Sequence, residues 1–563
     1  IGSRYKYPSQ QGCSRVDDYL ETSLKQFDTI ISFVQEERAL SLQDRRFAFI
    51  AGAQWEGDWG EQFINVPQVE INKTAAGLDK IVNDYRANRM TVDFRPADGV
   101  ASADTADMLD GLFRADAYHS KAQQALDNAF EEGAAGGYGA WRVTNEYEDE
   151  YDPDNDHQRI CTYAIMDADQ SVFWDPNAKL YDKSDAEYCF LITAMATEAF
   201  IAEYGADRLT TWPSGIWKLH YDWFTPDVVR VAEKYEVEVK TYLPRIFSNP
   251  LTGEEERYWA TEMEEGQADD LIAQAWEELP SRKVKPRRSA KTDMSGAEIL
   301  KPKRYIAGDC IPIIPFYGQR RFIDNMERAQ GHVRKAKDPA RVYNSQIAQL
   351  VETTSLTPRE VPIFDPAQVA GLESHWSDMN VERHAYALAR AIRNDDGTVA
   401  HLGPIGTLTP PQLQPVLAAL IQITAGDIRE LTNADDGADQ VIANTSAEAM
   451  DIAATRTDEK SAIYMDNMRQ SVQRWGEIYL GMAREVYVED GRTVETLGED
   501  GEEGQAVLLE PYTDEAGNFS IRNDLARGRY KVIADVTEAT STRRDKTVKA
   551  ALNGAQIAAS FDP

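Results

Sequence analysis

The sequence predicts an α+β fold that is divided among several domains. With 563 residues the chain is too long for one simple core, so roughly two to four domains are expected. Segments with apolar residues three and four apart alternate with segments in which apolar and polar residues alternate, which predicts helices and strands in turn. A hydrophobic fraction of 42% is enough to fill well-packed cores.

Composition excludes several classes of protein. A formal net charge of −34 argues against a surface that grips nucleic acid everywhere, because tight phosphate binding uses many lysines and arginines. The same charge is compatible with a wall past which nucleic acid slides. No uncharged apolar run reaches the length of a membrane span, and no signal-peptide pattern is present. The 4 cysteines lie far apart, which favours a reduced protein made in the cytoplasm.

The first part of the chain is predicted to be mainly helical. Apolar spacing predicts helices over 16–37, 41–52, 72–90 and most of 101–132, with a strand and turn at 91–99. The last helix runs into GAAGGYGAWRV, whose glycines invite a phosphate-loop interpretation. That motif needs a preceding strand and a Lys-Ser/Thr pair, so a glycine-capped helix end feeding a strand is the favoured interpretation.

An acidic segment, EDEYDPDND at 148–156, resembles a calcium loop. An EF-hand loop requires glycine at its sixth position and glutamate at its twelfth. Counted from Asp152, those positions hold His157 and Tyr163. The segment is therefore predicted to be a solvated hairpin turn.

The middle of the chain is predicted to be rich in strands. Alternation predicts antiparallel strands over 217–247, a helix over 263–279, and a hairpin formed by SRKVKPRRSAKT and EILKPKRYIAG. Basic residues gather between Arg282 and Arg304 against only Asp293 and Glu298. Two interpretations stay open, since cations protect exposed sheet edges as readily as they bind nucleic acid.

Residues 331–350, GHVRKAKDPARVYNSQIAQL, form a basic, helix-forming stretch that follows a predicted buried strand, IPIIPFYG. Asp338 and Pro339 are typical of a helix start, because a carboxylate caps free amides and proline is tolerated in the first turn. Tyr343, Ile347 and the pair Leu350 and Val351 then share one face. In isolation, such a helix is more often a solvated surface element than a functional one.

Two further helices follow a segment of short mixed elements at 356–409. The first is predicted over 410–432, and a polar stretch at 433–444 follows it. Thr445 and Glu448 form a capping-box pattern that opens a helix to about 489. At 1.5 Å per residue this helix would span roughly 65 Å. Its apolar face has heptad-like spacing: Met468, Val472, Trp475, Tyr479, Met482 and Val486. Strands are predicted from 493 onward, with a final helix near 541–560.

The sequence resembles the portal proteins of short-tailed bacteriophages, of the type found in Salmonella phages. Eight segments carry the resemblance in family order: AGAQWEGDW, RANRMTVDFRPADG, GAWRVTNEYED, FWDPNAKLYDKSDAEYC, VAEKYEVEV, IAGDCIPIIPFYG, GHVRKAKDPARVYN and LARGRYKVIADV. The resemblance implies an α+β portal fold with a helix-and-sheet wing, a helical stem, a small α/β clip, a long central helix and the start of a helical crown. Such proteins form a ring, typically of twelve subunits, through which DNA enters and leaves the capsid.

The family's domains can be assigned by the same resemblance. It implies the following parts: 1–320 wing, 321–355 first stem helix, 356–409 clip, 410–432 second stem helix, 433–444 tunnel loop, 445–489 long wing helix, 490–540 C-terminal wing strands and 541–563 start of the crown. Family members usually continue into a larger crown, sometimes with a barrel. Since this sequence ends at Pro563, we expect a barrel to be absent or removed.

The resemblance also implies which residues face DNA. The stem candidates are Arg334, Lys335, Lys337, Arg341 and Arg429. The tunnel-loop candidates are Asp435, Asp436, Gln440 and Asn444. A few cations in a repulsive channel would make weak, sequence-blind phosphate contacts. Each of these residues could equally be solvated or pair with a neighbouring subunit.

Partners and location follow from the family. The resemblance implies a homo-oligomeric ring, expected to be a dodecamer, that passes double-stranded DNA without sequence specificity. It implies docking to the large terminase ATPase, to major capsid and scaffolding protein, and at the clip to head-to-tail adaptor and tail proteins. The protein would be assembled in the host bacterial cytoplasm and reside at the capsid portal vertex of the virion, without contact with a membrane.

No catalytic residue, metal site or cofactor is expected. The sequence has no P-loop, GxSxG or HExxH motif, and its 7 histidines lack metal-ligand spacing. Energy for packaging must then come from a separate ATPase. Two alternatives remain: a passive head–tail adaptor ring, and a tail-associated carboxylate hydrolase. With 94 acidic residues, carboxylate pairs arise by chance and do not by themselves indicate a hydrolase.

Overall fold

The computed structural model divides into two compact units. Unit 1 comprises Ile1–Ala48, Gly77–Arg334 and Asp436–Pro563, and unit 2 comprises Phe49–Ala76 and Lys335–Asp435. The structure describes residues 16–64, 66–149, 151–152, 155–209, 222–225, 227–239, 244–248, 255–259, 277–279, 286–353, 361–377, 387–408, 415–432, 447–498, 501–513 and 519–538. The predicted tunnel loop at 433–444 and the predicted final helix at 541–560 lie outside these ranges.

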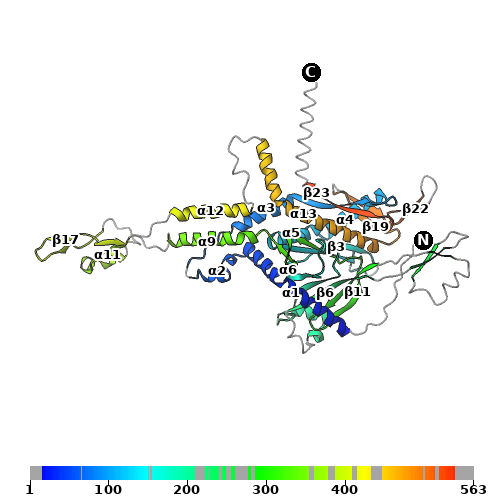
Figure 1. The fold of residues 1–563 in the computed structure, drawn as a ribbon, viewed down its shortest axis with the longest axis horizontal. Coiled ribbons are helices and arrows are strands. Elements are labelled where there is room, and N and C mark those ends of the chain that lie inside the picture. The colour runs from blue at the N-terminus through cyan, green and yellow to red at the C-terminus, as the bar shows by residue number, and fades with distance from the viewer. Residues whose placement is uncertain are drawn as a thin grey trace, which may run out of the picture. The chain divides into compact units, whose positions relative to one another are not determined.

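A five-stranded antiparallel sheet forms one layer of unit 1, in the order β11-β10-β6-β5-β4. Its strands are β4 (Val172–Trp174), β5 (Tyr188–Ala196), β6 (Val228–Val239), β10 (Arg287–Met294) and β11 (Ile299–Tyr305). The hairpin predicted from the basic segments is confirmed by the pairing of β10 with β11. Helix α1 (Val16–Phe49) packs on this sheet, where the Phe27 ring centroid lies 5.2 Å from that of Phe173 (Figure 1). Because α1 is one continuous helix, the predicted break between 37 and 41 is wrong.

A three-stranded antiparallel sheet, β12-β2-β3, lies at the centre of unit 1. Its strands are β2 (Tyr138–Tyr147), β3 (Gln158–Ala164) and β12 (Ile313–Tyr317). Every residue of β12 is buried, which confirms the predicted buried strand. Helix α5 (Ala122–Gly136) ends at Gly137, whose φ of 107° is left-handed, and β2 follows directly. The glycine-capped helix end is therefore confirmed.

The longest helix of unit 1 is α13 (Ala447–Val486), with 40 residues. Its heptad face is buried as predicted, since Met468 and Val472 are 0% exposed and Trp475 is 4% exposed. The Ser471 hydroxyl donates to the carbonyl of Pro315 in β12 at 2.8 Å. Trp475 Nε1 donates to Thr162 Oγ1 of β3 at 3.1 Å. Thr445 of the predicted capping box lies outside the described residues, as does the side chain of Glu448.

Smaller elements complete unit 1. Its remaining helices are α3 (Lys73–Ala87, which begins in unit 2), α4 (Ala103–His119), α6 (Ala168–Ser171), α7 (Thr197–Tyr204) and η2 (Ala206–Leu209). Its remaining strands pair antiparallel as β1 (Asn88–Pro96) with β23 (Tyr530–Glu538), β13 (Gln319–Ile323) with β14 (Met326–Gln330), β19 (Thr493–Leu497) with β20 (Glu503–Val507), β21 (Glu510–Thr513) with β22 (Phe519–Arg522), and β7 (Pro244–Ser248) with both β8 (Glu255–Trp259) and β9 (Glu277–Leu279). Residues 277–279 thus form a strand, and the helix predicted there is wrong; 263–276 lie outside the described ranges.

Unit 2 contains a pair of helices and a set of short elements. Its members are η1 (Ala53–Trp55), α2 (Asp58–Glu61), η4 (Arg334–Ala336, which begins at the last residue of unit 1), α9 (Lys337–Val351), β15 (Val361–Ile363), α10 (Pro366–Val369), α11 (Glu373–Ser377), β16 (Ile392–Arg393), β17 (Val399–His401), β18 (Gly406–Leu408) and α12 (Pro415–Thr432). Strand β15 pairs with β18, and β16 pairs with β17. The mixed α+β fold class predicted from the sequence is confirmed.

Candidate functional site

Helix α9 begins within one residue of the start that Asp338 and Pro339 predict, and after the first residues of the range 321–355 that the resemblance gave to the first stem helix. Residues 319–330 form the β13–β14 hairpin, and a Cβ on Gly331 would lie 1.9 Å from the carbonyl oxygen of Ala135. This close approach holds 331 against the end of α5, so 331 lies outside the helix. The helix starts at Lys337 with Ala336 as its N-cap. Asp338 therefore lies within the first turn and is not the predicted cap.

The buried face of α9 carries a polar residue that the sequence analysis missed. Tyr343 is 7% exposed and Asn344 is 1% exposed, while the predicted neighbours Ile347, Leu350 and Val351 are only partly buried. Asn344 Nδ2 donates to Gln54 Oε1 at 2.5 Å, and the Ile71 amide donates to Asn344 Oδ1 at 3.1 Å. Both hydrogen bonds tie 49–76 to α9. An asparagine in an apolar stripe was the available signal, since buried amides require partners.

Helix α12 lies beside α9 in unit 2 (Figure 1). Thr424 Oγ1 lies 3.3 Å from Gln346 Oε1 of α9 and donates to the Leu420 carbonyl at 2.8 Å. Ile428 and Thr432 are 1% and 0% exposed. These positions, four residues apart, define the buried side of α12.

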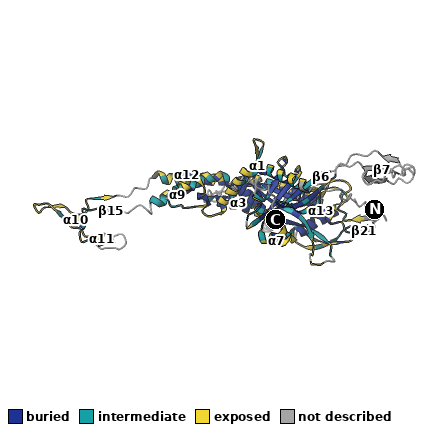
Figure 2. Ribbon diagram, turned by 90° about the horizontal axis from the view of Figure 1, so that it is seen from below, coloured by how far each residue is buried: buried dark blue, intermediate teal, exposed yellow. Residues whose placement is uncertain are grey.

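A second apolar face of α12 is exposed. We call it the α12 stripe: Val416, Leu420, Ile423 and Leu431, which are 64%, 44%, 60% and 41% exposed. Spacings of four, three and eight residues place them on one side of the helix. Figure 2 shows exposed and intermediate residues along α12, whereas buried residues predominate around α13. The α12 stripe is therefore an apolar face of an amphipathic helix, and no described residue of the chain covers it.

Arg334, the first predicted channel cation, lies in unit 1 against α1. Its Nε donates to Asp44 Oδ2 at 2.7 Å, and its Nη1 contacts Glu37. Asp44 is fully buried and Glu37 is 8% exposed. Although burial opposes the charge, Asp44 and Glu37 raise the pKa of Arg334 overall. Two buried carboxylates already engage this guanidinium, so its geometry argues against the predicted phosphate contact.

The other predicted stem cations lie in unit 2. Lys335 and Arg429 are exposed, whereas Lys337 and Arg341 are partly buried. Lys337 and Arg341, four residues apart, lie along one side of α9, and Lys335 precedes the helix in η4. These cations therefore do not form a single row. Their role at DNA stays a prediction, and Asp435, Asp436, Gln440 and Asn444 lie outside the described residues.

The basic segment of the five-stranded sheet is occupied by ion pairs. Lys291 Nζ lies 2.9 Å from Glu233 of the neighbouring β6, and Lys303 Nζ lies 2.9 Å from Glu236. Lys301 reaches Glu203 at 2.8 Å. Burial opposes the charge on Lys303, but hydrogen bonds to Glu238 and Glu236 raise its pKa. This pairing within the chain favours the sheet interpretation over a nucleic-acid patch.

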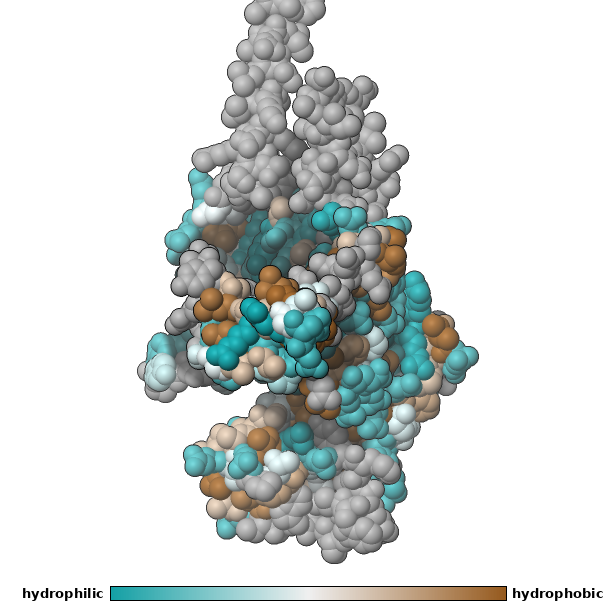
Figure 3. Space-filling model, turned by 90° about the vertical axis from the view of Figure 1, so that its left-hand side faces the viewer, coloured by the Kyte–Doolittle hydropathy of each residue, from teal (hydrophilic) through white to brown (hydrophobic). Residues whose placement is uncertain are grey.

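The described residues of the predicted clip (356–409), namely 361–377 and 387–408, expose apolar side chains. Asp365 caps α10, because its Oδ1 accepts from the Ala367 amide at 2.9 Å. The Asp365 amide in turn donates to Oε1 of the fully buried Gln368 at 3.1 Å. Val399 is 53% exposed and Leu402 is 78% exposed. Apolar patches of this kind lie among polar side chains on the face of the molecule shown in Figure 3.

Within the described ranges, no three His, Cys, Asp or Glu side chains are grouped so that they could hold a metal ion. None of the described helices combines the length and the apolarity that a membrane span requires.

Comparison with known proteins decides the family. Residues 24–563 match the family model of the Phage P22-like portal protein. The chain belongs to this family. A portal protein of Acyrthosiphon pisum secondary endosymbiont phage 1 is 38% identical to this portal chain over 542 residues, which are 95% of the chain and 75% of the relative. The resemblance inferred from the eight segments is confirmed. Portal proteins are structural components of the phage virion rather than an enzyme family.

Proposed function

We propose that copies of this portal protein close into a ring that conducts double-stranded DNA into and out of the capsid. One observation supports the ring most directly: the α12 stripe is apolar, regular and uncovered within the described chain. Apolar side chains aligned along one helix face favour contact with another surface, unlike apolar residues scattered singly. A neighbouring copy supplies such a surface, and a head-to-tail contact that closes produces a ring.

The negative charge of the chain supports a channel that lets DNA pass, as opposed to a surface that binds DNA tightly. A net charge of −34 repels a polyanion, so DNA would slide with little retention. Lys335, Lys337, Arg341 and Arg429 would supply a few weak, sequence-blind phosphate contacts. Arg334 is left out of this proposal because Glu37 and Asp44 engage it. The polar residues Asp435, Asp436, Gln440 and Asn444 are proposed to line the tunnel.

The partners are proposed from the family. The ring, expected to hold twelve copies, would receive DNA from the large terminase ATPase, assemble with capsid and scaffolding protein, and later bind adaptor and tail proteins. The exposed Val399 and Leu402 of the clip segment support a docking role there. The ring itself would hydrolyse no nucleotide, so purified protein should show no phosphate release above a buffer blank.

Electron microscopy of purified protein tests the ring. Negative-stain images should show closed rings with a central hole, and images of monomers or solid particles would contradict the proposal. Deletion of 435–439 then tests the tunnel assignment. The deletion should leave rings intact but impair packaging or retention of DNA, and particles that fill and hold DNA normally would refute that assignment.

A further inference from the structure

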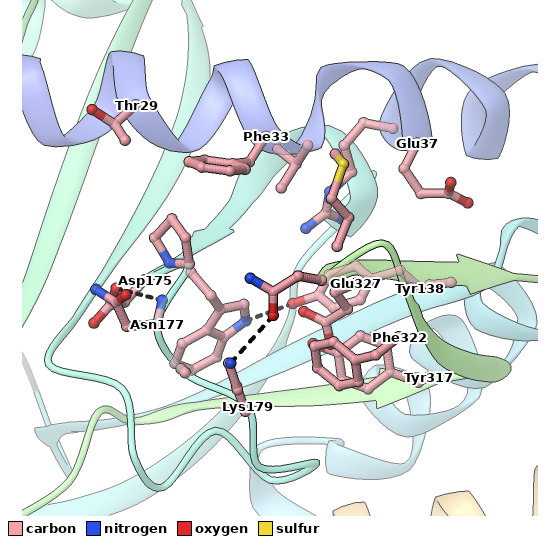
Figure 4. Close-up of a pocket in the computed structure, with 18 of the residues that line it drawn as sticks. Thr29, Phe33, Glu37, Tyr138, Asp175, Asn177, Lys179, Tyr317, Phe322 and Glu327 are labelled. Atoms are coloured by element: carbon pink, nitrogen blue, oxygen red, sulfur yellow. Dashed lines mark hydrogen bonds between the residues drawn. The ribbon is translucent and has the colours of Figure 1, made fainter.

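Unit 1 contains a cavity of about 300 Å³ between α1, the β13–β14 hairpin and the loop after β4. Aromatic side chains dominate its wall: Phe33, Tyr138, Trp174, Tyr188, Tyr317 and Phe322. Figure 4 shows Phe33 extending from α1, with Tyr138, Tyr317 and Phe322 on another wall. Phe33 and Phe322 are 49% and 47% exposed, so the rim presents two aromatic side chains to a partner. The size suits one aromatic side chain and its neighbours rather than a large ligand.

A cation without a carboxylate partner lies in this wall. Arg38 Nη2 donates to the Val172 carbonyl at 2.9 Å, and the guanidinium stacks 4.2 Å above the Tyr138 ring. Its Nη1 is buried and, among the described residues, has no hydrogen-bond partner; the same holds for the hydroxyl of Ser41, which is 3% exposed. Buried donors in native proteins are nearly always satisfied. Arg38 Nη1 therefore indicates a missing acceptor.

The cavity's own carboxylates do not fill that role. Of the three carboxylates that line the cavity, Glu37 pairs with Arg334 and Arg328, Glu327 pairs with Lys183 at 2.8 Å and with Arg320, and Asp175 accepts from the Asn177 amide at 2.9 Å. Lys179 at the rim reaches only Asn325 Oδ1, at 3.4 Å, and like Arg38 forms no ion pair within the described structure. The site therefore combines aromatic walls with two cations that lack carboxylate partners. A partner with an aromatic ring next to carboxylates would fit it.

The same chain presents such a segment elsewhere. Tyr151, at the turn between β2 and β3, is 94% exposed, the largest exposed fraction among the described apolar and aromatic side chains. Glu148, Asp149 and Asp152 surround it in sequence. Glu148 pairs with Arg492 at 2.7 Å, and the Tyr151 amide donates to Asp149 Oδ1 at 2.9 Å. An exposed tyrosine next to carboxylates matches the aromatic wall of the cavity and the unpartnered Nη1 of Arg38.

The cavity cannot take this turn from its own chain. Strand β2 begins with Tyr138, which lines the cavity, and ends with Tyr147, just before the turn. At roughly 3.3 Å per residue, the strand separates the two by about 30 Å. A ring contact joins two different patches of neighbouring copies, so patches at opposite ends of one strand are suitable for it.

We propose that the acidic β2–β3 turn of one copy inserts Tyr151 into the aromatic cavity of the next copy. The tyrosine ring packs against the aromatic wall, and a carboxylate beside it accepts from Arg38 Nη1. This interface rests on the proposed ring but is separate from the α12 stripe. It assigns a use to the unpartnered Nη1 of Arg38 and to the exposed Tyr151 together.

Cross-linking tests this contact. Phe33→Cys and Tyr151→Cys are combined in one chain, assembled protein is treated with a short bismaleimide, and the products are separated by denaturing electrophoresis. We expect a ladder of covalent oligomers. The matched control combines Phe33→Cys with Tyr118→Cys, since Tyr118 is also exposed, at 73%. That control should give no ladder. The variants with only one introduced cysteine should give none either, and they show whether the native cysteines react with the bismaleimide.

The outcomes separate this contact from the ring itself. If no ring forms, the proposed function is contradicted, and the contact that rests on it is contradicted as well. If rings form without a ladder and the cysteine at 33 reacts freely with maleimide, the cavity is open in the ring and fits another protein, which overturns the proposal. If that cysteine is protected but no ladder forms, another segment fills the cavity, and the assignment of Tyr151 is overturned.

Assembly of substituted chains gives an independent measurement. Tyr151→Ala should raise the subunit concentration for half-maximal assembly at least about tenfold, because an anchoring tyrosine carries much of an interface's affinity. Tyr151→Phe should restore most of that loss, and Tyr118→Ala should change it by less than about twofold. Equal effects of Tyr151→Ala and Tyr118→Ala would overturn the proposal.

Discussion

Helices α13 and α12 are both amphipathic, yet only one of them buries its apolar face within the chain. On α13, Met468, Val472 and Tyr479 are at most 2% exposed, and they pack against the sheets of unit 1. On α12, Val416 and Ile423 are 64% and 60% exposed. An apolar face that is buried in the monomer stabilises the fold, whereas an exposed one is available for assembly. Substitutions on the two helices should therefore affect different measurements.

The largest effect on stability is expected from Trp475 of α13. Its ring centroid lies 4.5 Å from that of Phe113, and its Nε1 donates to Thr162. Trp475→Ala should lower the free energy of unfolding by about 3–5 kcal/mol, because it leaves a cavity in the core. Urea denaturation at fixed chain concentration measures the loss. Ile423→Ala on α12 is the control and should change stability by no more than about 0.5 kcal/mol; equal losses would contradict the comparison.

A smaller but still large effect is expected from Arg334. Arg334→Gln removes the guanidinium that pairs with Asp44 and that shares Glu37 with Arg328, and the loss of one partner of a buried ion pair costs about 3 kcal/mol. The matched change is Arg429→Gln on α12. Because the Arg429 side chain is exposed, this change should alter the free energy of unfolding by at most about 0.5 kcal/mol. The same denaturation assay compares the two. If Arg334→Gln proved neutral, Arg334 would again be a candidate for the channel.

A pH-dependent effect is expected in the core beside α13. Burial raises the pKa of Asp116 to about 6, although the hydroxyls of Tyr479 and Tyr487 donate to it and act in the opposite direction. Between pH 4 and 6 the folded chain thus holds a proton that the unfolded chain has lost. The contribution of Asp116 is fully present below pH 4 and is lost as the pH rises through about 6.

The Asp116→Asn variant removes this dependence. The stability of the unsubstituted chain relative to the variant should fall by about 2–3 kcal/mol from pH 4 to pH 7, from a shift of about two pKa units. Denaturation at both pH values measures it, with Asp79→Asn on the exposed side of α3 as the control. A constant difference between Asp116→Asn and the unsubstituted chain across this range would show that Asp116 is ionised in the fold.

Local patterns predicted much of the fold. The heptad spacing of α13, the glycine at 137 and the alternation of β10 and β11 each reflect a periodicity that packing preserved. The misses arose where tertiary contacts overrode local signals. Gly331 packs against Ala135 directly after the β13–β14 hairpin, so 321–331 are not helical although the resemblance assigned 321–355 to the first stem helix, and residues 277–279 pair with β7 instead of continuing a helix. Neither contact can be read from nearby residues.

The candidate site was harder to predict than the fold. Basic side chains mark a possible phosphate contact, but sequence does not reveal which carboxylates engage them. Arg334 meets Glu37 and Asp44, about three hundred positions away in sequence, and Lys303 meets Glu236 on another strand. Asn344 was missed because its partners, Gln54 and the Ile71 amide, are equally distant along the chain. Exposure of the α12 stripe likewise depends on what else packs against α12.

The mass of the assembled particle tests the central claim most directly, namely that α12 carries an interface between copies. Native mass measurement of the unsubstituted protein should give one multiple of the 63.2 kDa subunit, expected to be twelve. Ile423→Lys should shift the mass towards monomer while leaving the urea midpoint unchanged. A 63.2 kDa monomer from the unsubstituted protein, or full-size particles from Ile423→Lys, would contradict the account.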